Sequence, residues 1–133
     1  MTFGPVSHPN VRGSTIAFLA RVLEGDSTIL KVLTRGMWYV DVEDLARLHA
    51  VALLDYHVEQ ERIIAMALPF DWTRVVACLW TLRPRNTSIP PLPPSSPRAN
   101  ELIMGPSRAL QLLESFFGRS DWTTLEDSLS PGI

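Results

Sequence analysis

A run of aromatic and branched residues passes directly into a long apolar stretch between Trp38 and Leu54, WYVDVEDLARLHAVALL. The segment 37–40 suits a half-buried strand. Asp41 is placed to cap the following helix, because its carboxylate accepts from backbone N–H groups that have no partner within the first turn. Asp44 stands in that turn, where the helix dipole favours negative charge. The stretch therefore predicts a strand that leads straight into a helix.

The expected helix is apolar over most of its circumference. Leu48, Val51 and Leu54 widen its apolar face, so that only three residues are expected in solvent, namely Glu43, Arg47 and Asp55. One stripe has helical spacing and consists of Val42, Leu45, Ala46, His49, Ala52, Leu53 and Tyr56. A helix of this kind needs packing partners on more than one side.

The composition indicates a globular protein. The chain has 133 residues, of which 46% are hydrophobic and 20% are charged, with a net charge of −2. Its positive charge comes from arginines and the single Lys31, spread along the chain, so no basic cluster indicates nucleic-acid binding. The only cysteine, Cys78, excludes an internal disulfide. No apolar run approaches the ~18–20 residues of a membrane span, and the start lacks signal-peptide features. We expect a soluble, cytoplasmic protein.

Similar signals predict further short elements along the chain. Strands are expected up to Phe3, at residues 29–33 and at residues 63–68. Helices are expected from Ser14 to Gly25, from Trp72 to about Leu82 behind the capping Asp71, from Ser107 to Gly118 with Phe116 and Phe117 inward, and after Thr123 or Thr124. The expected fold is α/β, with few short strands and about four helices.

Residues 84–98, PRNTSIPPLPPSSPR, carry six prolines and cannot form a regular helix. They are expected to be an extended strap or a flexible linker. The PPLPP run also suits a polyproline II ligand for an SH3-like domain, but it lacks a suitably spaced arginine. A strap is the preferred interpretation.

Four segments, in this order, resemble one protein family: FGP at residues 3–5, YVDVEDLARLHAVALL at 39–54, ERIIAMALPFDW at 61–72 and GRSDWTTLEDSL at 118–129. The family is the extended short-chain dehydrogenase/reductases of the NAD-dependent epimerase/dehydratase type. The closest branch is the ketoreductases similar to dihydroflavonol reductase and cinnamoyl-CoA reductase, in the form met in fungal secondary metabolism.

The resemblance implies the C-terminal, substrate-binding portion of an extended Rossmann-type reductase. A substrate-side α/β region is expected at residues 1–83 around the strand–helix unit at 37–56. The proline-rich strap or linker at 84–98 and a C-terminal helical segment at 99–133 follow.

The family's cofactor motifs do not occur in this sequence. The family binds its dinucleotide at a glycine-rich turn, where backbone amides approach the pyrophosphate, and it uses a Tyr-x-x-x-Lys pair for proton transfer. The seven glycines here form no such cluster, and Tyr39 and Tyr56 are followed four residues later by Glu43 and Gln60. We expect no cofactor site in this chain alone; NADP or NAD would require a partner or an upstream half.

Catalytic residues remain unknown at this stage, with His8 and His49 as candidates. A buried structural histidine is the preferred explanation of His49, because it lies in the apolar stripe. No metal site is expected, since no histidine stands at ligand spacing from the acidic helix start. The resemblance implies that the segment 3–10 lines the substrate pocket, which gives as substrate-binding candidates Phe3, Pro5, Ser7, His8 and Asn10.

A set of large side chains fits either the floor of a pocket for a planar polyketide or, as we prefer, the hydrophobic core. Its members are Met66, Phe70, Trp72, Trp80, Met104 and Trp122.

Three functions of different class follow. The first is a truncated or split ketoreductase that keeps the lobe for a polyketide or phenolic substrate and lacks hydride transfer on its own. The second is a cofactor-free cyclase, isomerase or dehydratase that uses His8, His49 or an acidic residue. The third is a non-catalytic interaction or scaffold protein. Without a cofactor half, apolar surface on the central strand and helix would be uncovered, so we expect a homo-oligomer or a complementing chain.

Overall fold

The structure is a computed structural model that describes residues 1–6, 14–33, 36–93 and 108–132. It is α/β, as the sequence predicts. Its elements are β1 (Thr2–Phe3), α1 (Ser14–Leu23), α2 (Thr28–Val32), β2 (Met37–Asp41), α3 (Val42–Leu54), β3 (Leu68–Phe70), α4 (Trp72–Leu82), α5 (Arg108–Phe117), α6 (Leu125–Leu129) and a terminal 3-10 turn (Ser130–Gly132).

A small three-stranded sheet lies at the middle of the molecule, in the order β1-β2-β3. β1 runs parallel to β2, with Thr2 opposite Val40, and β3 runs antiparallel to β2. The backbone N–H of Val40 donates to the carbonyl of Met1 at 2.9 Å, and the Met1 ammonium donates to the Trp38 carbonyl at 2.6 Å. The sheet therefore joins the start of the chain to the central strand.

Three helix starts are capped as predicted. The Asp41 carboxylate accepts from the backbone N–H of Glu43 at the start of α3. The Asp71 carboxylate accepts from the N–H of Arg74 in α4, and Thr124 is the residue that caps α6. These caps confirm that the strand–helix unit and the two later helices begin where local side-chain chemistry places them.

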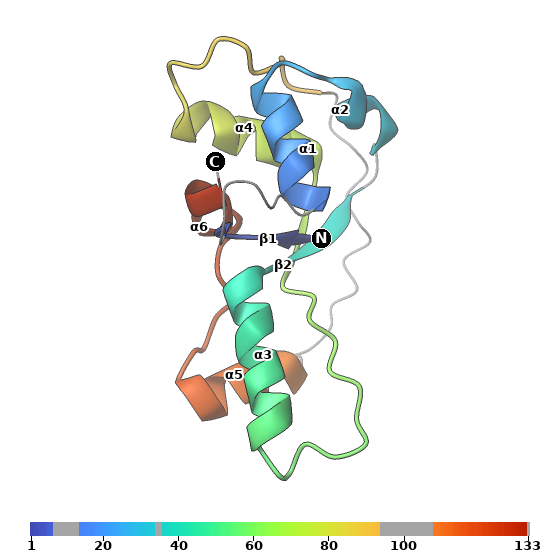
Figure 1. Ribbon diagram of the computed structural model, residues 1–133, viewed down its shortest axis with the longest axis vertical. Helices are drawn as coiled ribbons and strands as arrows, with labels where there is room; N and C mark the ends of the chain where they lie inside the picture. Colours follow the sequence, from blue (N-terminus) through green and yellow to red (C-terminus); the bar gives the residue numbers. More distant parts are fainter. Residues whose placement is uncertain (7–13, 34–35, 94–107, 133) are drawn as a thin grey trace.

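Two hydrophobic clusters share the central unit. In Figure 1, α1, α4 and α6 lie on one side of the strands along the long axis, and α3 with α5 lies on the other. The larger cluster contains the aromatic side chains of Phe3, Tyr39, Phe70 and Trp72 together with residues of α1, α2, α4 and α6. The smaller cluster consists of Leu48, Val51, Ala109, Leu112 and Leu113. β2 and α3 thus connect one core to the other.

The strand predicted at residues 29–33 is wrong, because these residues lie mostly in α2. The Asp26 carboxylate accepts from the backbone N–H of Thr28 at 2.8 Å and so starts a helical turn. Ile29 and Leu30 are consecutive and both buried. A strand would point them to opposite faces, whereas one helical turn brings both against the same core.

The strand predicted at residues 63–68 is wrong over most of its length, since only Leu68 belongs to β3. Pairing with β2 begins with the N–H of Ala67, which donates to the carbonyl of Tyr39 at 2.9 Å. β2 ends at Asp41, where α3 begins, so among the described residues no strand continues alongside the residues before Ala67.

The apolar stripe predicted as the buried face of α3 points largely to solvent. The buried residues of α3 are Asp44, Leu48 and Val51, and α5 covers them. Leu53 is 84% exposed, and Tyr56, beyond the end of the helix, is 78% exposed. The helix is apolar on two faces, and contact with α5 decides which one is buried.

Other large side chains also differ from expectation. Phe116 and Phe117 were expected inward but are exposed, because α5 meets α3 through its other face. Phe70 and Trp72 are core residues as expected, whereas Met66 and Trp80 are exposed. Trp122 is partly buried against the smaller cluster, and Met104 lies outside the described residues.

The backbone of Thr123 is held from both sides by the central unit. Its N–H donates to the Asp44 carboxylate at 2.9 Å, and its carbonyl accepts from the Tyr39 hydroxyl at 3.0 Å. Asp44 has 0% exposure and is also paired with Arg47 at 3.0 Å and with Arg119 at 3.4 Å. We call this set the Thr123 clamp: Tyr39, Asp44, Arg47, Arg119 and Thr123.

The described part of the proline-rich segment lies against the larger cluster. The side-chain amide of Asn86 donates to the Leu23 carbonyl at 2.9 Å, and Ile89 and Pro90 are buried. The Thr73 hydroxyl donates to the Pro93 carbonyl at 3.3 Å. Residues 86–93 thus run from the end of α1 to the start of α4. Separately, none of the helices in the described ranges has the length and apolarity needed to cross a membrane.

Tyr39→Phe is expected to lower the free energy of unfolding by about 1–2 kcal/mol, because the Thr123 carbonyl loses its partly buried donor. Urea denaturation measures the change. Tyr56→Phe is the matched control and should change the value by less than about 0.5 kcal/mol, since its ring is mostly exposed. Equal effects of the two substitutions would contradict a structural role for the Tyr39 hydroxyl.

Candidate functional site

The segment expected to line a substrate pocket is described only in part. Phe3 is 1% exposed and packs against the rings of Tyr39 and Phe70 at centroid distances of 5.9 and 5.3 Å. Pro5 is exposed. The other three candidates lie outside the described residues, namely Ser7, His8 and Asn10. Phe3 therefore anchors the start of this segment in the core, and substrate contact by the segment stays a prediction.

Gly4 brings the end of β1 close to the start of α3. Its φ is +128°, a backbone conformation that side chains disfavour. A Cβ atom at this position would stand 2.6 Å from Cγ1 of Val42 and 2.9 Å from Oδ2 of Asp41. Only glycine allows this approach, so the FGP segment is fixed against the cap of α3.

His49 is exposed, so the expectation that it is buried is wrong. Its Nδ1 donates to the Leu45 carbonyl at 2.8 Å, because a carbonyl oxygen can only accept. In the neutral ring, the Nε2 atom then carries the lone pair. No described acidic side chain is paired with His49 in a way that would orient it as a base.

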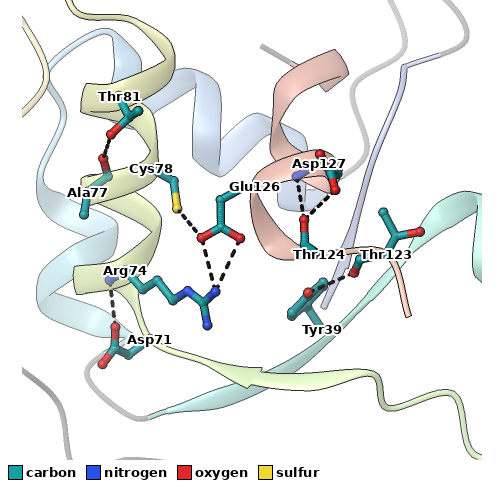
Figure 2. Close-up of polar contacts among 10 residues, drawn as sticks. All are labelled: Tyr39, Asp71, Arg74, Ala77, Cys78, Thr81, Thr123, Thr124, Glu126 and Asp127. Atoms are coloured by element: carbon teal, nitrogen blue, oxygen red, sulfur yellow. Dashed lines mark hydrogen bonds and ion pairs between the residues drawn. The ribbon is translucent and has the colours of Figure 1, made fainter. Parts of the chain in front are cut away.

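A groove between α4 and α6 is a further candidate site. Its volume is about 320 Å³, and it is lined by Arg74, Ala77, Cys78, Thr81, Leu82 and Glu126. Figure 2 shows Arg74 and Cys78 reaching from one face of α4 toward Glu126 of α6. The Glu126 carboxylate accepts from Arg74 Nη2 at 3.1 and 3.3 Å and from Cys78 Sγ at 3.4 Å.

Cys78 and Glu126 are held in unreactive states by their contact with each other and by the pairing of Glu126 with Arg74. Burial, assisted by the Glu126 hydrogen bond and charge, raises the pKa of Cys78 to about 11. Burial also raises the pKa of Glu126, but hydrogen bonds from its own backbone, Cys78 and Arg74 outweigh this and lower it. A neutral thiol and a weakly basic carboxylate are poor catalysts at neutral pH. The groove is thus suited to binding rather than to bond cleavage.

Sequence reasoning missed this groove. The sequence does show that Arg74 and Cys78, four residues apart on a predicted helix, lie on one face of it. Their partner Glu126 lies 48 residues beyond Cys78. No local pattern indicates that α6 packs on that face.

The described residues do not fit a dinucleotide site. The three glycines with positive φ in the described ranges lie in different surroundings: Gly4 at α3, Gly25 beside Ser88, and Gly118 in open space. They form no cradle at a helix start of the kind that binds a pyrophosphate. Within the same ranges, no group of three or more acidic, histidine or cysteine side chains has the arrangement of a metal site.

The chain is similar in sequence to fungal ketoreductases, which confirms the resemblance. It is 43% identical over all 133 residues to ketoreductase adrE of Penicillium roqueforti, and the match covers 39% of that protein. It is 36% identical over 130 residues to ketoreductase nvfG of Aspergillus novofumigatus, covering 37% of it. It is also 41% identical to the NAD-dependent epimerase/dehydratase tndE of Aspergillus flavipes over 69 residues. This match covers 50% of this chain and 19% of tndE.

The chain thus spans about two fifths of the length of the two ketoreductases, in their C-terminal part. No protein-family model matches it.

Solved reductases share the fold. The crystal structure of Gre2 from Candida albicans superposes with a TM-score of 0.62 at 17% identity, covering 98% of this chain and 40% of Gre2. Yeast methylglyoxal/isovaleraldehyde reductase Gre2, complexed with NADPH, gives 0.59 at 18% identity, covering 96% of this chain and 41% of that one. The chain therefore has the fold of one part of these reductases.

Gly4→Ala is expected to destabilise the protein by about 2–3 kcal/mol, because the new methyl adds a clash with Val42 to the backbone strain. Gly118→Ala is the matched control: its φ is +68° with nothing within 4 Å, so strain alone should cost about 1 kcal/mol. Thermal and urea denaturation measure both. A smaller loss for Gly4→Ala than for Gly118→Ala would contradict the close approach.

The Cys78 thiol is expected to react with iodoacetamide at pH 8 about a hundredfold more slowly than an exposed cysteine, from its thiolate fraction alone. The rate should rise as the pH approaches 11, because the thiolate forms only there. Glu126→Gln should shift this rise to lower pH by removing the carboxylate charge. Glu114→Gln, an exposed change on α5, should leave the profile unchanged. Identical profiles for the two variants would contradict the pairing of Cys78 with Glu126.

Proposed function

We propose that this chain is the substrate-side part of an NAD(P)-dependent ketoreductase and holds a ketone of polyketide or phenolic type. The observation that carries the proposal is 43% identity across the whole chain to the ketoreductase adrE. The complex of yeast Gre2 with NADPH supports NADPH as the cofactor of the complete enzyme. Hydride transfer then depends on a dinucleotide-binding part, which the described residues do not form.

The state of the two tyrosines supports a binding rather than a proton-transfer role. The Tyr39 hydroxyl donates to the Thr123 carbonyl, and burial raises the pKa of this phenol well above its ordinary value. Tyr56 is exposed and stacks on His57 at a centroid distance of 3.8 Å. A reductase tyrosine needs a lowered pKa to pass its proton to the carbonyl oxygen. Tyr39 does not meet this requirement, and Tyr56 is followed four residues later by Gln60 rather than by a lysine.

The segment after β1 is the proposed substrate-binding element, and the proline-rich segment is the proposed strap over the substrate-binding region. Gly4 and the buried Phe3 fix the start of residues 3–10 beside α3. The packing of residues 86–93 on the larger cluster supports a strap at residues 84–98 between the regions 1–83 and 99–133. The free, buried thiol of Cys78 suits a reducing compartment, so we place the protein in the cytoplasm.

A non-catalytic interaction role is the second candidate function. It is favoured by the exposed apolar side chains along α3, which suit a homo-oligomer or a complementing chain. A cofactor-free cyclase, isomerase or dehydratase would use an acidic residue, His8, which lies outside the described residues, or His49, which is exposed.

The purified chain is expected to show no saturable binding when NADPH or NADH is titrated against nicotinamide fluorescence. A chimera in which this chain replaces the matching 39% of adrE should bind NADPH and oxidise it when a ketone substrate of adrE is added. Intact adrE is the positive control.

Either of two results would overturn the proposal. Micromolar NADPH binding by this chain alone would mean that it forms a dinucleotide site itself. A chimera that binds NADPH but reduces no ketone would mean that this chain does not supply a working substrate side.

A further inference from the structure

The turn that follows α4 presents a serine behind two arginines. Arg83 and Arg85 stand five and three residues before Ser88, and all three residues are exposed. Among the serines and threonines of the whole sequence, only Ser88 has arginines at both of these positions. Arginine pairs with a carboxylate through two parallel hydrogen bonds. Two guanidinium groups at this spacing before a hydroxyl therefore suit a protein kinase whose peptide-binding site carries carboxylates.

The local structure leaves this serine accessible. The backbone N–H of Asn86 donates to the Arg83 carbonyl at 2.9 Å, and the N–H of Ser88 donates to Oδ1 of Asn86 at 3.0 Å, so both bonds lie within the turn. The contacts that hold this turn to the larger cluster are the bond from Asn86 to the Leu23 carbonyl and the buried side chain of Ile89. A surface turn with so few anchors opens locally at low cost in free energy, as entry into a kinase peptide site requires.

Ser88 also lies against the end of α1. A Cβ atom at Gly25 would stand 3.1 Å from the carbonyl oxygen of Ser88 and 3.8 Å from its Cβ. Figure 1 shows the segment after α4 passing this end of α1. The C-terminal end of a helix carries a partial negative charge, and Glu24 adds a carboxylate next to Gly25. The neighbouring Asp26 is already paired with Arg21. This surface repels a phosphate attached to Ser88.

We propose that Ser88 is a phosphorylation site for an arginine-selecting protein kinase and that the phosphate releases residues 86–89 from the end of α1. In this step, Oγ of Ser88 attacks the γ-phosphorus of Mg²⁺-bound ATP and the bond from that phosphorus to the bridging oxygen breaks, so ADP leaves. A carboxylate of the kinase accepts the hydroxyl proton. The product carries a charge of about −1.5 to −2 at pH 7. The proposal does not depend on a reductase function of the chain.

Phosphate incorporation tests the site. A purified kinase that prefers arginine at the third and fifth positions before serine, supplied with Mg²⁺ and ATP, should add one phosphate to the folded chain. Tandem mass spectrometry should locate it at Ser88, and none should appear at the exposed Ser120, which has no arginine at either position. Arg83→Ala and Arg85→Ala should each lower kcat/KM roughly tenfold or more, because each removes one carboxylate pair. Thr87→Ala, the matched exposed control, should leave kcat/KM unchanged.

Hydrogen exchange tests the release. After phosphorylation, backbone amides in residues 84–93 and at the end of α1 should exchange roughly tenfold faster, because the turn opens more often. Amides of α5, which packs in the smaller cluster, should not change. Treatment with a phosphatase should restore the original rates.

Three results would overturn the proposal. Phosphate on a synthetic peptide of residues 81–91 but not on the folded chain would mean that the turn is inaccessible. Incorporation that survives Ser88→Ala would place the site on another residue. Unchanged or slower exchange after phosphorylation would mean that the phosphate pairs with the arginines of the turn and holds it in place, which removes the proposed release.

Discussion

The backbone of Thr123, held between Tyr39 and Asp44, is the interaction on which the rest of the structure depends. Asp44 is a fully buried carboxylate, and burial of a charge is costly unless it is paired and hydrogen-bonded. Here Arg47, Arg119 and the Thr123 N–H share it. The clamp fixes the crossing segment between α5 and α6, so α5 reaches the smaller core and α6 the larger one. One buried charge thereby sets the position of two helices.

Local side-chain chemistry made the central unit and the helix caps predictable from sequence. Asp41, Asp71 and Thr124 act within three residues of their own position, so no knowledge of the fold was needed. The strand at residues 29–33 was predicted wrongly because the β-branched Ile29 favours a strand, whereas the nearby Asp26 carboxylate starts a helical turn. The strand at residues 63–67 was predicted wrongly because a strand also needs a neighbouring strand to pair with, and the composition of a segment does not show whether one is present.

Contacts between distant residues made the orientation of α3 and the groove unpredictable. Periodicity located the apolar stripe of α3, but it could not show that α5 covers the opposite face, where an aspartate is buried. The Asp44 partner Thr123 is 79 residues away, and the Cys78 partner Glu126 is 48 residues away. The candidate residues Ser7, His8 and Asn10 lie outside the described ranges, so the substrate side of the site still rests on the resemblance.

The position of α6 also determines when the larger cluster can be completed during synthesis. Leu125 and Leu129 are almost fully buried in the same cluster as Phe3, which lies about 120 residues before them in the sequence. A ribosome adds about 5–20 residues per second, so the aromatic side chains of the larger cluster remain uncovered for several seconds until α6 has been made. During that interval they are exposed to misassembly, and a nascent chain of this kind has reason to engage a chaperone before release.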